Sequence, residues 1–205
     1  LTTTGTDAIT ITMVAASTAA ADLNIIDGKT SVAVGATAIT ELTGNATDVK
    51  TALASSGITT VTNGSLAVNV NSGTASVADI NTINADSATG IVTATVTSAA
   101  ASVLKGLQTD SNDAITMTVN AEAASAATLA ADLVSLNGNT NRVITMTAVS
   151  SVIGSYADLL AVYVTNEAQY NGLGNEAVTI TGSVTAVQAD AIADKTSGVV
   201  IATIT

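Results

Sequence analysis

The 205-residue sequence contains no cysteine, no proline and no histidine, and its three aromatic residues are all tyrosine. Without cysteine, neither a disulfide nor a thiolate metal site can form. Without histidine, the chain lacks the usual general base and the commonest metal ligand. The absence of proline fits a fold in which nearly every backbone N–H is used in a sheet or a helix. We therefore expect a scaffold that has no enzyme activity and needs no cofactor.

Positive charge is also scarce, because 5 Lys and Arg residues face 16 Asp and Glu residues, giving a net charge of −11. So few cations cannot neutralise a phosphate backbone, which argues against nucleic acid as a partner, and anionic membrane surfaces are disfavoured for the same reason. The uncharged stretch from Thr51 to Ala78 is interrupted by Ser, Thr, Asn and Gly, so we expect no membrane insertion. The acidic, cysteine-free composition predicts an extracellular or cell-surface location.

Hydrophobic residues make up 47% of the chain, and nearly all of this share is Ala, Val, Ile and Leu. Such a core is built from many small and similar side chains instead of a few aromatic anchors. The chain also starts and stops within its pattern of repeats, and its first residues show no signal peptide. We therefore expect a fragment of a larger protein.

Two sequence echoes indicate an internal duplication. Residues 7–12 (DAITIT) match residues 113–118 (DAITMT), and each is followed by an Ala-Asp-Leu, at residues 21–23 and 131–133. A second echo pairs Ala85-Asp86 and Gly90 with Ala193-Asp194 and Gly198. Both echoes have an offset of about 106–108 residues, which predicts one solenoid over residues 1–205 with repeats at approximately 1–108 and 109–205.

A smaller strand-plus-helix unit recurs inside these halves. Strand-like segments that alternate β-branched residues with Thr lie at residues 9–13, 32–34, 66–70, 91–96, 115–119, 143–148, 178–181 and 199–204. Between them lie Ala-rich segments with apolar residues at helical spacing, such as Val77, Ile80 and Ile83. Strands joined through helical crossovers pair in parallel. The predicted fold class is α/β, a repeat solenoid of strand–helix units with parallel stacked strands, prism-like, in about two coils of three or four units each.

This architecture predicts the partners of the chain. One strand and one short helix cannot bury their apolar faces alone, so neighbouring repeats of the parent protein must stack on them. A stack of only two coils leaves open sheet edges at both ends. We therefore expect end-to-end self-association through the open coil edges.

Several runs resemble repeats of very large secreted or cell-surface, adhesin-like proteins of marine bacteria and cyanobacteria. The runs that carry the resemblance are residues 27–34 (DGKTSVAV), 181–189 (TGSVTAVQA) and 198–204 (GVVIATI). The similarity is one of repeat style and covers nearly the whole chain. It implies a structural stalk or surface coat, and it supplies no catalytic residues.

Calcium is the first candidate ligand, because acidic secreted repeats often bind it. Neither an EF-hand loop nor a glycine-rich nonapeptide is present, so the candidates reduce to Asp110 and Asp113, with Ser111 and Asn112 between them. Helix capping and turn formation are the alternative roles of this pair. A pair of catalytic carboxylates at Asp86 and Asp194 is disfavoured, because the echo makes the two equivalent, and active sites are rarely duplicated in register.

Tyr156, Tyr163 and Tyr170 stand seven residues apart and would lie along one stripe of a helix. They form a possible partner surface, for a carbohydrate or a protein, although packing of the helix on its scaffold explains such a stripe equally simply. The function that the sequence predicts is a rigid spacer, stalk or surface-layer element of a large bacterial surface protein. A calcium- or glycan-binding adhesin module is the alternative.

Overall fold

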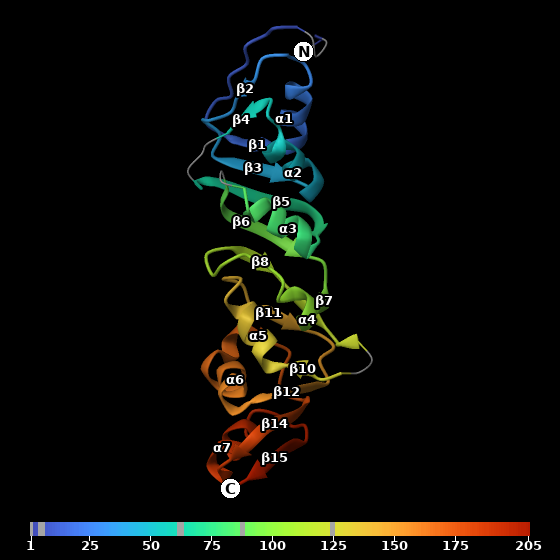
Figure 1. The fold of residues 1–205 in the computed structure, drawn as a ribbon, viewed down its shortest axis with the longest axis vertical. Helices are drawn as coiled ribbons and strands as arrows, with labels where there is room; N and C mark the ends of the chain where they lie inside the picture. Colours follow the sequence, from blue (N-terminus) through green and yellow to red (C-terminus); the bar gives the residue numbers. More distant parts are fainter. Residues whose placement is uncertain (1, 4–6, 61–63, 87–88, 124–125) are drawn as a thin grey trace. The chain divides into compact units, whose positions relative to one another are not determined.

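Parallel strands connected through short helices build every sheet of the protein. The computed structural model describes residues 2–3, 7–60, 64–86, 89–123 and 126–205. These residues form a mixed α/β fold with four sheets of parallel strands and seven α-helices (Figure 1). The chain divides into two compact units, unit 1 (Leu1–Val96 and Asn112–Ile115) and unit 2 (Thr97–Ser111 and Thr116–Thr205).

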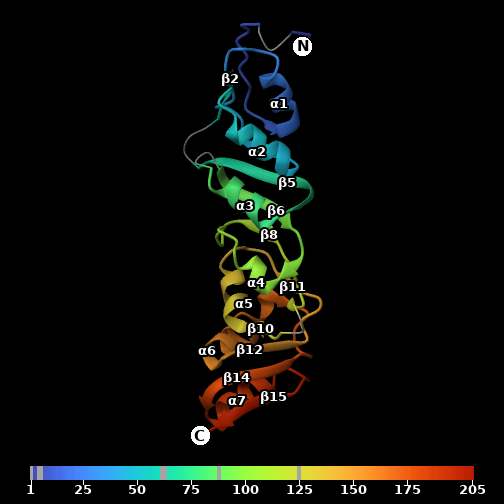
Figure 2. The same cartoon turned by 45° about the vertical axis from the view of Figure 1, so that its right-hand side comes forward.

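Unit 1 holds two sheets and three helices. Its larger sheet has the order β1-β3-β5-β6-β8, and the first two residues of β8 belong to unit 1. The second sheet pairs β2 with β4, and Thr12 bridges to β2 at Gly35. The bounds are β1 Ser17–Ala19, α1 Ala20–Asp27, β2 Val34–Gly35, β3 Glu41–Gly44, α2 Ala46–Ala54, β4 Ile58–Thr59, β5 Leu66–Ala75, α3 Val77–Asn84, β6 Thr89–Val96 and β8 Ala114–Thr116. The helices α1, α2 and α3 lie beside the larger sheet (Figure 2).

Unit 2 holds two four-stranded sheets, with the orders β10-β12-β14-β15 and β13-β11-β9-β7. Its elements are β7 Ala99–Ala100, α4 Ala101–Leu104, β9 Thr118–Asn120, β10 Thr128–Leu129, α5 Ala130–Asn137, β11 Ile144–Met146, β12 Ser151–Ser155, α6 Tyr156–Leu160, the π-helix η2 Ala161–Thr165, the 3-10 helix η3 Glu167–Gln169, β13 Tyr170–Asn171, β14 Ala177–Val184, α7 Ala186–Ala193 and β15 Val200–Ile204.

The strand register corrects the predicted coil length. Paired residues lie between 20 positions apart, as for Ala99 and Val119, and 27 apart, as for Thr118 and Thr145. A coil of about 108 residues with three or four units would instead pair strands about 108 positions apart. The prediction of about two such coils is therefore wrong, because each strand pairs directly with the strand of the next unit along the chain.

Alternation in the strands and capping of the helices explain why these segments fold as they do. In β5, Leu66, Val68 and Val70 are buried while the residues between them are not, as expected for a strand with one core face. Helix α3 begins at Ser76, whose side chain forms a capping box with Asp79. Helix α7 begins with the same arrangement, between Thr185 and Gln188.

The two units present similar elements in a similar order. Helices α1, α2 and α3 begin at residues 20, 46 and 77, and α5, α6 and α7 begin at residues 130, 156 and 186. In the strands, Glu41 pairs with Ala67 in unit 1, and Ser151 pairs with Ala177 in unit 2. Positions about 110 residues apart can therefore be compared directly, which sets Leu66 of unit 1 against Glu176 of unit 2.

Candidate functional site

The candidate site is a pocket of about 200 Å³ in unit 2. It lies where the segment after α6 passes through η2 and η3 into β13, and where the chain leaves α7. Its lining residues are Val162, Tyr163, Glu167, Tyr170, Asn171, Gly172, Leu173, Gly174 and Lys195. Gly172 and Gly174 have φ angles of +99° and +117°, which a glycine adopts without strain, so the loop between β13 and β14 can turn tightly here.

A buried carboxylate organises this loop from behind the pocket. Glu176 is 1% exposed, and its carboxylate accepts hydrogen bonds from the backbone N–H of Gly174 at 2.9 and 3.1 Å and from that of Asn175 at 3.1 Å. The Tyr163 hydroxyl donates a further hydrogen bond to Glu176 Oε1. A buried carboxylate is tolerated only when such donors satisfy it. Glu176 therefore fixes the loop and the tyrosine in one arrangement.

The two pocket tyrosines keep their hydroxyl groups turned into the protein. Burial, together with the hydrogen bond to Glu176 and its charge, raises the pKa of Tyr163 far above its ordinary value. The Tyr170 hydroxyl donates to the backbone carbonyl of Leu133 at 2.9 Å, and burial raises the pKa of Tyr170 to about 12. Both rings stay neutral near pH 7, so they offer the pocket ring surface instead of an acid or a base.

An ion pair lies among the residues that line the pocket. Lys195 Nζ is 2.6 Å from Glu167 Oε2, and the two side chains are 33% and 61% exposed. Surface pairs of this kind contribute little to stability. Their opposite charges, with the polar backbone of the Gly172–Gly174 loop, are the groups that can orient a small polar molecule against the tyrosine rings.

The predicted tyrosine surface is corrected by the structure. Tyr163 is 3% exposed and Tyr170 is 6% exposed, so neither can form an exposed partner surface. Only Tyr156, the first residue of α6, is half-buried. The helical stripe also ends early, because α6 passes into η2 at Ala161 and Tyr170 begins β13.

The predicted calcium pair has two very different environments. Asp113 is 4% exposed, and its Oδ1 accepts a hydrogen bond of 2.8 Å from the backbone N–H of Val92. Asp110 is exposed. Across the residues that the structure describes, no group of three or more acidic side chains is placed to hold a metal ion. Calcium binding by Asp110 and Asp113 stays a prediction.

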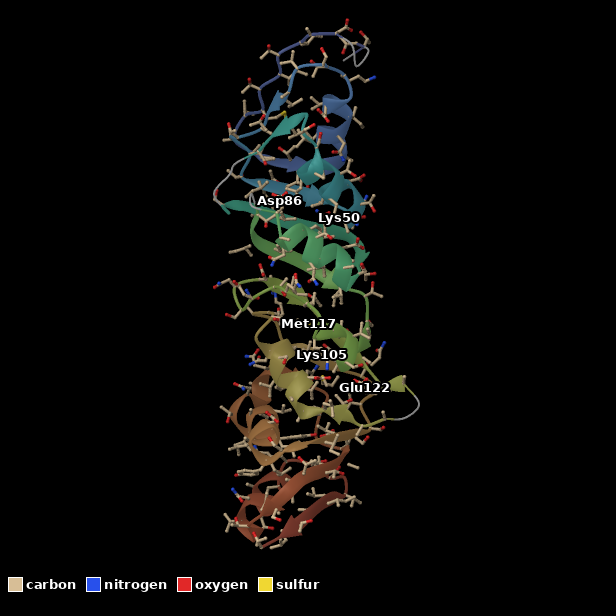
Figure 3. The ribbon with its side chains drawn as sticks, viewed as in Figure 1. Lys50, Asp86, Lys105, Met117 and Glu122 are labelled. Atoms are coloured by element: carbon tan, nitrogen blue, oxygen red, sulfur yellow. The ribbon has the colours of Figure 1, made fainter. Side chains whose placement is uncertain are left out.

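The supposed equivalence of Asp86 and Asp194 is also corrected. The N–H of Asp86 donates to the carbonyl of Ile83 just after α3, and the N–H of Lys195 makes the same contact with Ile192 after α7. Asp86, labelled in Figure 3, therefore corresponds to Lys195. The echo misaligned the pair by one residue.

Glu176 is the site residue that sequence reasoning missed. It follows a loop of small residues and stands alone, without a second acidic residue within a helical turn. The one available signal was the strand alignment, which sets this glutamate at a position where unit 1 has the fully buried Leu66. A charged residue at a core position indicates a satisfied polar contact.

In the described part of the chain, no helix is both long and apolar enough to cross a bilayer. Comparison of the chain with family models, with curated proteins and with solved structures finds no match.

Proposed function

We propose that the chain is a structural spacer, in which each unit is a solenoid with one strand–helix coil per roughly 24 residues. The observation that carries the proposal is the register of the strands. In both units, strand partners recur at intervals of 20 to 27 residues, always in parallel. A segment built in this way gains length by adding coils, and its stability is a sum of contacts between neighbours.

Contacts between successive coils support this proposal. The buried hydroxyl of Thr30 donates to the carbonyl of Ile9 at 2.7 Å, and that of Thr109 donates to Asn139 at 2.8 Å. Thr196 donates to the carbonyl of Glu176 at 2.7 Å. Each bond joins residues 20 to 30 positions apart, about one coil. Threonine thus satisfies backbone carbonyls of the adjacent coil, which explains its abundance in this sequence.

The wider setting follows from the composition and from the resemblance to repeat arrays. We infer a large secreted or cell-surface bacterial protein as the parent, with unit 1 and unit 2 as products of a duplication. An acidic chain without cysteine suits an exterior location, and the scaffold needs no cofactor. The terminal coils are then the surfaces at which neighbouring segments dock.

Insertion of one coil tests the spacer directly. A second copy of residues 41–66 placed after Leu66 adds one β3–α2–β4 coil to unit 1. Because parallel strands lie about 4.8 Å apart, small-angle scattering should show an increase of about 5 Å in the length of unit 1, with a midpoint of thermal unfolding no lower than that of the parent. A scrambled 26-residue insert of the same composition is the control.

If the copied coil destabilises the chain as strongly as the scrambled insert, unit 1 is not a stack of interchangeable coils and the proposal fails.

The pocket of unit 2 favours glycan binding as a second candidate function. Its volume of about 200 Å³ suits one sugar ring, and Tyr163 and Tyr170 offer ring faces beside the polar Glu167–Lys195 pair. A panel of monosaccharides, titrated by calorimetry, tests this candidate. Binding that is lost in Lys195→Ala but kept in Lys29→Ala would support a glycan module, and calcium added to the same samples tests the metal alternative by its effect on the unfolding midpoint.

A further inference from the structure

Successive helices within each unit touch at a fixed pair of positions. The fifth residue of one helix contacts the third residue of the next. Lys50 of α2 pairs with Asp79 of α3, and Asn24 of α1 donates to the carbonyl of Asp48 in α2 at 3.0 Å. In unit 2, Lys105, five residues from the start of α4, lies 2.9 Å from Asp132 of α5. The position therefore joins one coil to the next in both units.

The α4 coil shows what a complete junction contains. Ala101, Leu104 and Leu107 are at most 5% exposed, so this coil buries an apolar face. Lys105 (Figure 3) then covers Asp132, which is 6% exposed. A carboxylate buried to this degree needs its cation, because an uncompensated charge in the interior is costly.

The first coil of unit 1 has the receiving half of this junction. Helix α1 begins Ala-Ala-Asp-Leu, as α5 does, and Asp22 holds the place of Asp132. Asp22 is exposed, however, and among the described residues of unit 1 none takes the place of β7 and α4.

Apolar residues at the same end are also incompletely covered. Ile11 and Met13 are half-buried, whereas Met117 and Val119, their counterparts about 106 positions later, are fully buried. The polar contacts of this region are nevertheless already formed. Thr3 Oγ1 donates to the carbonyl of Lys29 at 2.8 Å, as Thr109 does to that of Asn139. The end of unit 1 is thus built like the α5 coil without its neighbour.

We propose that this end of unit 1, defined by Asp22, Ile11 and Met13, docks a strand–helix coil of the α4 kind that carries a lysine or arginine at the fifth helix position. The inference rests on the spacer proposed above and names the chemistry of its neighbour. The partner supplies one positive charge to Asp22 and a small aliphatic face to Ile11 and Met13.

A second copy of this chain is not the occupant that the charges favour. Its last helix, α7, carries Asp190 at the fifth position, and Asp190 is exposed. Stacking α7 on α1 would bring Asp190 against Asp22, two like charges in a partly desolvated junction. Lys29 does not change this balance, because its counterpart Asn139 donates to the backbone carbonyl of Leu107 and not to a helix carboxylate. The expected end-to-end self-association is therefore narrowed to a basic partner coil.

The test extends the full chain with its own coil. A second copy of Thr97–Gly106 placed directly before Leu1 supplies the missing coil in the native order, since Leu1 stands where Leu107 follows Gly106. We expect the midpoint of thermal unfolding of unit 1 to rise by about 4–8 °C. Slower hydrogen exchange at the Met13 amide, which donates to Gly35 at 2.7 Å, assigns the gain to this end.

A charge-reversal cycle separates the lysine from the added bulk. The extended chain with Lys105→Asp in the copy, and the extended chain with Asp22→Lys, should each lose most of the gain. The doubly reversed chain should recover it. If the extension stabilises unit 1 equally in all four proteins, stacking holds but selection by charge is wrong. If the extension gives no gain while the inserted β3–α2–β4 coil is tolerated, the docking proposal alone fails. Concentration-dependent self-association of the native chain in sedimentation would overturn the choice of a basic partner.

Discussion

Unit 1 and unit 2 place opposite side chains at one core position. Leu66 is fully buried at the start of β5, and Glu176 is 1% exposed just before β14. Unit 2 accommodates the carboxylate because the N–H groups of Gly174 and Asn175 and the Tyr163 hydroxyl surround it. Unit 1 has the aliphatic Leu53 where unit 2 has Tyr163. The comparison shows that the coil dictates burial at this position, while polarity depends on the donors that neighbouring residues supply.

The largest effect is expected when the two positions are exchanged. Leu66→Glu places a carboxylate in unit 1 where Leu53 offers no donor, so the free energy of unfolding should fall by about 4 kcal/mol or more. Denaturant titration at pH 7 measures the change. The reciprocal Glu176→Leu should cost less, about 2 kcal/mol, because it leaves the N–H groups of the loop unsatisfied without adding a charge. Equal losses in the two variants would contradict the account of this position.

A glycine position that the units share should give the second largest effect. A Cβ at Gly198 would stand 2.1 Å from the Glu176 carbonyl oxygen, and one at Gly90 would stand 2.7 Å from that of Gly64. Both contacts are with backbone of the adjacent coil, so Gly198→Ala and Gly90→Ala should each lower stability by about 2–3 kcal/mol, as measured by thermal unfolding.

Gly28→Ala is the control for these glycines, because its nearest neighbours lie at 3.6 Å and its φ of −67° suits any residue. A control variant as unstable as Gly198→Ala would show that the close approach of coils is not the cause.

The two lysine junctions should differ in strength. Lys105→Met exposes the buried Asp132 to an uncompensated environment, so we expect a loss of about 2 kcal/mol. Lys50→Met breaks a pair whose side chains are 32% and 31% exposed, and solvent screening limits the loss to about 0.5 kcal/mol. Denaturant titrations of both variants test the ranking, and a larger loss for Lys50→Met would reverse it.

The Lys50 junction also has a predictable pH dependence. The hydrogen bond from Lys50, followed by that from Ser76, lowers the pKa of Asp79 below its ordinary 3.8. A lowered pKa in the folded state means that the stabilisation is present above the unfolded value and is lost as the pH falls through the folded value. Lys50→Met should therefore differ from the parent at neutral pH and converge with it in acid.

Alkaline pH should distinguish the units by the smallest amount. All three tyrosines belong to unit 2. Burial raises the pKa of Tyr170 to about 12 from 10.0, so its contribution to stability is complete below pH 10 and is lost as the pH rises toward 12. At pH 11 unit 2 should lose about 1 kcal/mol from this group. Tyr170→Phe should flatten the alkaline loss, and hydrogen exchange resolved by unit measures it. A loss confined to unit 1 would contradict the assignment.

Particular elements show how far the sequence alone predicts this fold. Parallel pairing was predictable, because Ala-rich helical segments separate the strands and a helical crossover returns the chain in the same direction. The coil length was not, because the strongest echo lies at about 106–108 residues and the weaker 24-residue unit varies in sequence. The long echo spans several coils, and it was taken for a single coil.

The site was less predictable than the fold. The seven-residue spacing of Tyr156, Tyr163 and Tyr170 indicates a shared helix face, but spacing does not reveal whether that face meets the core or the solvent. Here the helix ends between the second and third tyrosine, and the hydroxyl groups of both buried rings find partners inside the unit. Glu176 could not be identified without the strand register, because its donors are backbone groups that have no sequence signature.

Cysteine cross-linking tests the coil length most directly, and the natural chain contains no cysteine to interfere. Thr43 and Asn69 are register partners in β3 and β5, at the separation that a disulfide spans. Thr43→Cys combined with Asn69→Cys should form a disulfide under mild oxidation, as should Ile153→Cys with Thr179→Cys in unit 2. Failure of both pairs, together with a disulfide between cysteines at positions 43 and 151, which lie 108 apart, would contradict the account.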